Sequence, residues 1–371
     1  MSLRGAPSFC FTKTKQQGDV AVLRLPRPDG LAMTEKNDMK KNFKINELNV
    51  EESPLFWPAV LKGDTLFVLN ETLVPQKIQY EKVKNVKDAV KVIREMKTRA
   101  FGQFLVVLST FLVELKLNQS LAPQALVKHL EKVADALNNS RPTFPFAEVT
   151  SIVTYWAGQA LKEKKPVKEY VEKNISGYLM GIRMKRLGRV KEIAGILEDG
   201  DSVLTHCNVS GELAMASALC KKHGKKVSFF ATETRPYLQG AKLTVWELRM
   251  SGASVTLIAD NAVASVMDAG FVNKVIVGSD RNCANGDFAN KIGTYQIAVL
   301  AKEFGIPFYV LTQPSTKVKK GSDMPIEVRD AKELLEYEGK KWILEKVDGF
   351  YPGFDVVPHK LVTRAIPLMV S

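Results

Sequence analysis

The stretch Lys274 to Thr294, KVIVGSDRNCANGDFANKIGT, joins a short apolar run to a polar segment. The run Val275-Ile276-Val277 is β-branched throughout, which favours a buried strand. Gly278-Ser279-Asp280 ends this strand, and a loop of small and polar residues is expected up to Lys291. Helical spacing then covers 293–304. A strand, a polar loop and a helix in succession form the repeating unit of a doubly wound α/β domain.

The same alternation continues on both sides of this stretch. The pattern predicts strands over 202–205, 227–231, 254–258 and 308–311, and helices over 211–222, 242–251 and 261–269. Parallel strands joined by right-handed helical crossovers build a mostly parallel, Rossmann-like sheet. We therefore expect residues 179–371 to form a Rossmann-like catalytic domain.

The preceding residues, 43–178, carry a different pattern. Strands are expected over 65–69 and 77–83, which together predict a hairpin. Helical spacing follows over 86–93, 101–115, 123–137, 152–162 and 167–172. This part is predicted to be an N-terminal hairpin and helical bundle domain. Residues 1–42 are polar and interrupted by Pro and Gly, so a flexible extension is expected there.

Composition limits the class of protein. The 371 residues are 45% hydrophobic, and no apolar run reaches the roughly 18 residues of a membrane span, so neither a membrane protein nor a secretory leader is expected. The net charge of +13 lies in short lysine runs without interleaved aromatics, which disfavours nucleic-acid binding. The 4 cysteines lack C-x-x-C spacing, which argues against a disulfide framework and indicates a cytoplasmic protein.

Polar clusters follow the predicted strands, where ligands of open α/β sheets bind. Asp280 ends one strand and is expected either to point into a crevice or to cap the next turn. Cys207 follows the 202–205 strand and precedes a helix, whose N-terminus would lower the pKa of its thiol. The alternative is a small buried apolar cysteine.

Three further polar clusters follow the predicted strands, and two of them suggest an anion site. Arg235 is suited to hold a carboxylate or phosphate, or else to pair with Glu233. Asp260 is placed to cap a helix. The segment from Asn290 to Thr294 opens a helix with a lysine and a glycine, which favours an anion. The histidines lack metal-ligand spacing, and neither G-x-x-x-x-G-K-[ST] nor G-x-G-x-x-G occurs.

Several motifs together resemble those of the methylthioribose-1-phosphate isomerase family. They are His206-Cys207-Asn208, Glu233 to Thr244, Gly278-Ser279-Asp280-Arg281, Gly286-Asp287, Asn290 to Tyr295, Ile306 to Val310, Pro325-Ile326-Glu327 and Phe354 to His359. The resemblance runs from about Thr65 to His359. The wider superfamily also holds ribose-1,5-bisphosphate isomerases and regulatory subunits of a translation-initiation exchange factor.

The resemblance implies an aldose–ketose isomerase of methionine salvage that acts on 5-methylthioribose 1-phosphate as a homodimer, without metal or organic cofactor. Asp280 and Cys207 would be the acid/base pair. Asp280 would exchange protons with a sugar oxygen, and Cys207 would carry the proton of C2, although a hydride shift is an open alternative. The phosphate or sugar would be held by Arg99, Arg141, Gln239, Asn290 and Lys291.

The sequence departs from the family in two places. The family's Arg-Gly-Ala-Pro phosphate loop corresponds to Arg99-Ala100-Phe101-Gly102, which keeps the arginine and replaces two small residues. The segment after Cys207 is also shorter than usual. Two alternatives therefore stay open. One is an isomerase of a related ribose or deoxyribose phosphate, and the other is a non-catalytic subunit like the translation-initiation members.

Overall fold

The structure is a computed structural model, and it describes residues 48–368 except 143, 315–316, 338, 342 and 344–346. The predicted extension over 1–42 lies outside the described residues. The division at residue 178 stays a prediction, and a single helix, α6 (Val167–Ile196), runs through that position.

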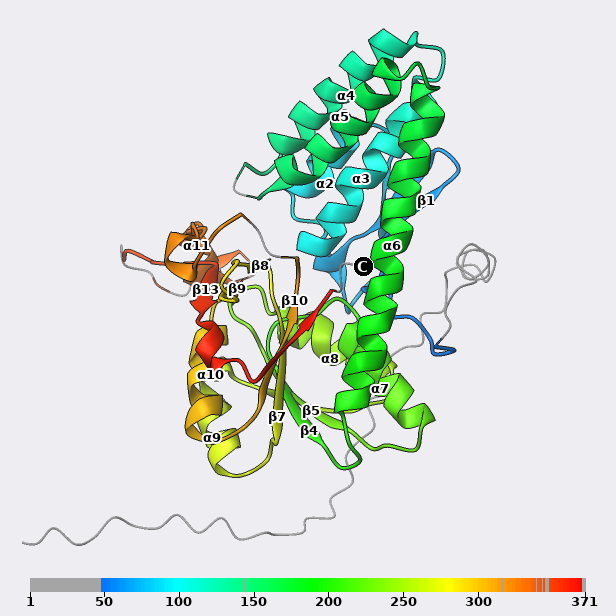
Figure 1. The fold of residues 1–371 in the computed structure, drawn as a ribbon. Coiled ribbons are helices and arrows are strands. Elements are labelled where there is room, and N and C mark those ends of the chain that lie inside the picture. The colour runs from blue at the N-terminus through cyan, green and yellow to red at the C-terminus, as the bar shows by residue number, and fades with distance from the viewer. Residues whose placement is uncertain are drawn as a thin grey trace, which may run out of the picture. The chain divides into compact units, whose positions relative to one another are not determined.

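The N-terminal part is a small antiparallel sheet backed by helices (Figure 1). The expected hairpin is present as β2 (Thr65–Leu69) and β3 (Tyr80–Val83), and β1 (Ala59–Lys62) adds a strand that the pattern did not predict. The helices are α2 (Val86–Arg94), α3 (Ala100–Leu117), α4 (Pro123–Asn138), α5 (Phe146–Lys162) and α6, which continues well past the predicted 167–172. Asn85 caps α2 by accepting from the backbone N–H of Asp88.

Helix α3 forms the centre of this part. It is long and apolar enough to cross a membrane by length and composition, and 72% of it is buried inside the protein. Its side chains from Leu105 to Leu115 join the core made with β2, α4 and α5. Burial against other helices on most sides explains why the helix is apolar nearly all around its axis.

The C-terminal part is built on a six-stranded sheet in the order β14-β10-β7-β4-β5-β6, and all of its strand pairs are parallel. The strands are β4 (Ser202–Thr205), β5 (Ser228–Thr232), β6 (Ser254–Ile258), β7 (Lys274–Gly278), β10 (Phe308–Thr312) and β14 (Arg364–Pro367). In chain order this is the 3-2-1-4-5-6 arrangement of a Rossmann fold. The Rossmann-like sheet is as predicted, but β14 is a sixth strand that the pattern did not predict.

Helices cover both faces of the sheet (Figure 1). One face packs against α6, α7 (Glu212–Lys222) and α8 (Val245–Met250), and the other against α9 (Val263–Asp268) and α10 (Thr294–Glu303). Within a strand the side chains alternate between the two cores, as Ile276 does against Val275 and Val277. Burial on both faces explains the continuous apolar runs of inner strands such as β7 and β10.

Shorter elements lie around the sheet. They are η1 (Glu71–Leu73), the π-helix η2 (Gly240–Thr244), η3 (Asp260–Ala262), η4 (Gly321–Asp323), α11 (Lys332–Leu335), β11 (Glu336–Tyr337), β12 (Lys340–Lys341) and η5 (His359–Leu361). The predicted loop after Asp280 is wrong, because β8 (Arg281–Asn282) and β9 (Phe288–Lys291) form an antiparallel sheet with β13 (Phe354–Val357). These strands were not predicted because their residues are largely polar. They are polar because one edge of this sheet faces the pocket described below.

Candidate active site

The candidate site lies where the strand order of the parallel sheet reverses. Cys207 follows β4, the first strand in chain order, and Asp280 follows β7, the fourth. These two strands are neighbours, and the connections that leave them run to opposite sides. Such a switch point opens a crevice at the carboxyl ends of the strands. Topology alone therefore brings Cys207 and Asp280 to one crevice.

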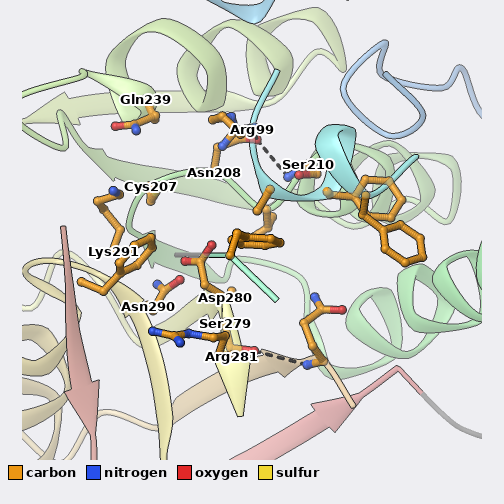
Figure 2. A pocket seen from close by; sticks show the side chains of 18 of the residues that line it. Arg99, Cys207, Asn208, Ser210, Gln239, Ser279, Asp280, Arg281, Asn290 and Lys291 are labelled. Carbon is orange, nitrogen blue, oxygen red and sulfur yellow. Dashed lines mark hydrogen bonds between the residues drawn. The ribbon is translucent and has the colours of Figure 1, made fainter. Parts of the chain in front are cut away.

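A pocket of about 860 Å³ occupies this crevice and extends to the helical part. All seven predicted site residues line it: Arg99, Arg141, Cys207, Gln239, Asp280, Asn290 and Lys291. Arg99 directly precedes α3, Gln239 directly precedes η2, Cys207 and Asp280 follow strands β4 and β7, and Asn290 and Lys291 lie in β9, so that both parts of the fold contribute (Figure 2).

Asp280 points into the pocket, toward the space that Cys207 and Lys291 border (Figure 2). Its side chain makes no hydrogen bond to any described residue. Burial raises the pKa of its carboxyl group, while the charges of Lys291, Arg99 and Arg141 oppose that rise. A carboxyl group in such surroundings can hold a proton and release it to a reacting oxygen.

Cys207 is nearly fully buried, and its backbone adopts a left-handed conformation with φ of 63°. Its N–H donates to Thr234 Oγ1 at 3.0 Å, and its carbonyl accepts from Thr244 Oγ1 at 2.5 Å. These bonds hold a strained conformation, which is common at functional sites. The hydroxyl groups of two threonines therefore fix the position of the thiol.

The expected lowering of the Cys207 pKa is wrong. Burial raises the pKa of the thiol, and the nearby charges of Arg99 and Lys291 only partly oppose this effect. The following helix, α7, begins at Glu212, and the backbone N–H group that lowers the pKa of the thiol belongs to Asn208, outside that helix. The sequence placed Cys207 correctly between a strand and a helix, but it could not show that the thiol would be buried.

His206 is a structural histidine beside the thiol. Its Nε2 donates to the carbonyl of Ile292 at 2.9 Å, which leaves Nδ1 to accept from Thr232 Oγ1 at 2.6 Å. Burial lowers the pKa of this imidazole, so the neutral form is favoured. His206 thereby ties the end of β4 to the segment after β9.

Arg99 lies at the N-terminus of α3 between two parts of the chain. Its Nε donates to Glu71 Oε2 at 2.5 Å, and its Nη2 donates to Asn208 Oδ1 at 2.5 Å. Its third nitrogen, Nη1, makes no hydrogen bond within the described residues. The guanidinium group is thus held by its Nε and Nη2 atoms, while the residue lines the pocket.

Arg141 lies across the pocket from the sheet and is held on both sides. Its Nη1 donates to Gln103 Oε1 at 3.0 Å, and its Nη2 donates to Glu327 Oε2 at 2.9 Å. The guanidinium group also lies over the ring of Phe144, 4.9 Å from its centroid. The sequence gave no signal for Gln103, which is fully buried and orients Arg141.

Two lining residues have unmet polar groups. Lys291 is only 7% exposed, yet it forms no ion pair with a described residue and packs over the ring of Phe354 at 4.5 Å. Gln239 is 8% exposed, and its Oε1 has no hydrogen-bond partner. A buried cation and a buried acceptor without partners are costly unless a ligand supplies them. Asn290, by contrast, donates to Thr294 Oγ1 at 2.9 Å.

The predicted anion site at the N-terminus of α10 is wrong in its backbone part. The N–H groups of Gly293 and Tyr295 donate to Asp355 Oδ2 at 2.7 and 3.1 Å. A carboxylate of the chain therefore already occupies the helix end. Only the side chains of Asn290 and Lys291 reach the pocket from this segment.

Two other interpretations also require correction. Arg235 is outside the pocket, and its guanidinium group lies over the ring of Tyr337, 5.5 Å from the centroid. Asp260 does not cap α9; its two carboxylate oxygens each accept at 2.7 Å, from the N–H groups of Thr234 and Arg235. Asp260 thus shapes the turn that presents Thr234 to Cys207.

Phe101, the bulky residue of the altered motif, packs beside the pocket. Its ring contacts those of Trp57 and Phe104, and the guanidinium group of Arg186 lies 3.8 Å from its centroid. Phe101 therefore leaves the Arg99 guanidinium group in the pocket wall and adds an apolar surface beside it. Among residues 48–368, as far as they are described, no group of three His, Cys, Asp or Glu side chains is arranged to hold a metal ion.

Comparisons with known proteins place the chain in a family. The sequence profile of the initiation factor 2 subunit family matches residues 103–367. The methylthioribose-1-phosphate isomerase of Thermosipho africanus is 39% identical over 334 residues, which cover 82% of this chain and 91% of that protein.

Two solved structures share the fold. The crystal structure of 5-methylthioribose 1-phosphate isomerase from Pyrococcus horikoshii aligns with a TM-score of 0.76 and 31% identity, covering 86% of this chain and 94% of the other. That of the translation initiation factor eIF-2B, subunit delta, from A. fulgidus aligns with a TM-score of 0.73 and 31% identity, covering 84% and 94%.

Proposed function

Because the chain belongs to the methylthioribose-1-phosphate isomerases of the initiation factor 2 subunit family, we propose that it converts 5-methylthioribose 1-phosphate to 5-methylthioribulose 1-phosphate. This aldose–ketose isomerisation belongs to methionine salvage. The observation that carries the proposal is the presence of Cys207, Asp280 and Lys291 in one pocket, where the carboxyl and ammonium groups have no hydrogen-bond or ion-pair partner among the described residues.

The phosphate is the group that the cations of the pocket would bind. Lys291 offers a buried ammonium group without an ion pair, and Arg99 offers its free Nη1. Charge-assisted hydrogen bonds from such groups are roughly twice as strong as neutral ones. Gln239 Oε1 needs a donor, which a sugar hydroxyl supplies.

The first chemical step is ring opening. The phosphate on C1 prevents the ring from opening as a free sugar does, so the C1–O4 bond must break while O4 takes a proton. Asp280 is the acid in this proposal, because burial raises its pKa and keeps the carboxyl group protonated over a wider pH range. The hydroxyl proton of O2 is released when C2 becomes the carbonyl carbon, and it restores the acid.

The second step moves hydrogen from C2 to C1. In the proposed route the Cys207 sulfur takes the proton from C2 and returns it to C1, so the phosphate stays on a CH2 group. The raised pKa of the thiol makes its deprotonation the demanding part of this step. In the alternative route the hydrogen passes directly as a hydride and Cys207 only shapes the pocket. Deuterium at C2 is retained at C1 in a hydride shift and is at least partly lost to solvent through an exchangeable thiol.

The experiment that tests the proposal measures turnover of 5-methylthioribose 1-phosphate by NMR, with wild-type, Cys207→Ser and Asp280→Asn proteins. Conversion by the wild-type protein and a loss of about 10²-fold or more in each variant are expected. Equal turnover in all three proteins would refute the assigned acid/base pair. Light scattering of the same samples tests the homodimer that we propose from the family resemblance.

One observation favours a second candidate substrate. The Arg99 motif carries Phe101 where the family has a small residue, and its ring adds apolar surface near the sugar site. An isomerase of a ribose or deoxyribose phosphate with another substituent at C5 would use the same acid and cations. A panel of 1-phosphates that differ only at C5 decides, since the favoured substrate has the highest kcat/KM. A non-catalytic subunit would turn over none of them.

A further inference from the structure

We propose that Glu247, which does not line the pocket, is a positioning residue that orients Arg99 through the side chain of Asn208. The inference rests on the proposed function in one respect only, that Arg99 holds the anionic group of the ligand. It gives a role to the buried carboxylate of Glu247, which takes part neither in the proposed acid/base chemistry nor directly in binding the anion.

Glu247 lies in α8 and is 2% exposed. Its Oε1 accepts from Asn208 Nδ2 at 2.6 Å, and its Oε2 accepts from Ser53 Oγ at 2.8 Å. A buried carboxylate costs free energy unless it is paired. Its closest polar contact toward the pocket is the neutral amide of Asn208, and beyond that amide lies the guanidinium group of Arg99.

The contacts of Asn208 leave its amide only one orientation. Its Oδ1 accepts from Arg99 Nη2 at 2.5 Å and from the N–H of Ser210 at 2.9 Å. Its Nδ2 donates to Glu247 and to Thr244 Oγ1, the latter at 3.0 Å. Rotating the amide by 180° would face its NH2 toward the guanidinium group and its oxygen toward the carboxylate. Glu247 therefore determines that Asn208 presents an acceptor to Arg99.

Thr244 extends the same network to the thiol loop. Its hydroxyl group accepts from Asn208 and donates to the carbonyl of Cys207 at 2.5 Å. The carbonyl belongs to the residue with the left-handed backbone. One hydrogen-bonded chain thus joins Glu247 to Arg99 on one branch and to Cys207 on the other.

Arg99 needs this support because a long side chain has many rotamers. Glu71 fixes its Nε, and Asn208 fixes its Nη2, so that Nη1 is left in one place at the pocket wall. If Asn208 loses its orientation, only the contact with Glu71 remains. The guanidinium group can then swing about Nε, and binding of an anion must first order it again.

The test is a double-mutant cycle on the binding of inorganic phosphate, with the dissociation constant measured by calorimetry. We expect Glu247→Ala to weaken phosphate binding roughly tenfold in the wild-type background. In an Arg99→Met background it should change the constant by less than about twofold, because its effect passes through Arg99. Ser53→Ala, which removes the other partner of the same carboxylate, is the matched control and should bind phosphate like the wild-type protein.

Two further variants keep the test decisive. Glu247→Gln keeps an acceptor for Asn208 and should restore most of the affinity. If only the negative charge of Glu247 mattered, Glu247→Gln would bind phosphate as weakly as Glu247→Ala, and that result would contradict the proposal. If Glu247→Ala does not fold, Glu247→Leu fills the same volume without an acceptor and should show the same loss. In kinetics, the loss should appear in KM more than in kcat.

Equal losses in the wild-type and Arg99→Met backgrounds would overturn the proposal, since Glu247 would then act independently of Arg99. Failure of the wild-type protein to bind phosphate would overturn it as well. If the wild-type protein binds phosphate but does not convert the sugar phosphate, the proposed function is refuted, and the double-mutant cycle still tests the role of Glu247.

Discussion

Nη2 of Arg141 donates to Oε2 of Glu327 at 2.9 Å, so a carboxylate of the chain contacts a cation that is expected to hold the substrate. The same carboxylate accepts from Arg329 Nη1 at 3.2 Å. Arg329 in turn donates to Tyr237, another pocket residue. Glu327 therefore links the helical part to the C-terminal segment across the pocket.

This contact predicts that Glu327 competes with an anionic substrate for Arg141. We expect Glu327→Gln to lower KM for the sugar phosphate about threefold or more, since a nearby negative charge is removed at the cost of one ion pair. Glu333→Gln is the matched control, because Glu333 pairs with Arg329 without contacting Arg141. A KM for Glu327→Gln that is unchanged or raised relative to this control would contradict the competition.

The second prediction concerns the thiol and the carboxyl group. Cys207→Ser and Asp280→Asn should each lower kcat by about 10²-fold or more while KM changes little. Cys220→Ser provides a matched control, because Cys220 is a buried free cysteine that donates weakly to the carbonyl of Ala194, away from the pocket. Loss of activity in Cys220→Ser as large as that in Cys207→Ser would mean that packing, not chemistry, explains the effect.

The third prediction concerns pH and stability. Burial raises the pKa of Glu247 from 4.5 to about 7. Between these values the unfolded chain releases the proton while the folded chain keeps it, so rising pH lowers the free energy of unfolding by up to about 3 kcal/mol. Glu247→Gln lacks this dependence.

The measurement is urea unfolding of both proteins at pH 5 and pH 8. The stability of Glu247→Gln relative to the wild-type protein should increase between the two pH values. Asp355, whose pKa burial raises to about 6, contributes equally to both proteins and cancels in the comparison. Parallel curves would show that Glu247 is ionised in the folded protein well below pH 7.

The fourth prediction concerns Gly240 at the start of the π-helix. A Cβ atom there would lie 1.8 Å from the carbonyl oxygen of Thr232 and 2.8 Å from Thr234 Oγ1. Gly240→Ala must therefore shift the backbone beside Gln239 and the threonine that holds Cys207. We expect at least tenfold lower kcat/KM, because displacement of the groups that hold a reacting centre is costly.

Gly188→Ala is the control for this substitution. Gly188 lies within α6, and a Cβ atom there would meet no other atom within 4 Å. Alanine should stabilise the helix by up to about 1 kcal/mol and leave activity unchanged. Full activity in Gly240→Ala would show that the π-helix backbone does not determine the position of the thiol.

Periodicity predicted most of the parallel sheet, because its inner strands are buried on both faces and its helices carry regular apolar stripes. Strands 202–205 and 254–258 match β4 and β6 to the residue. The same reasoning failed for β8 and β9, where Arg281, Asn290 and Lys291 line a polar pocket instead of a core. The predicted helix 167–172 also ended well before α6 does, because arginines on α6 are buried through ion pairs such as that of Arg189 with Glu212.

The convergence of Cys207 and Asp280 was predictable because the carboxyl ends of neighbouring parallel strands meet at one crevice, whereas Arg99 and Arg141 were expected there only from the family resemblance. The pKa values of the site residues could not be predicted, since a pKa depends on burial and on charges brought from elsewhere in the chain. Cys207 is the clear case, with a pKa raised by burial instead of lowered by a helix. The partners of Arg99 and Arg141 were equally hidden, because Asn208 and Glu327 lie far from them in sequence.

Turnover by the wild-type protein tests the proposed isomerase activity most directly. Purified protein is mixed with 5-methylthioribose 1-phosphate, and ketose formation is followed by NMR beside a sample without protein and one with Asp280→Asn. We expect conversion within minutes by the wild-type protein and almost none in the two controls. A folded wild-type protein that leaves the aldose phosphate unchanged would contradict the proposed activity.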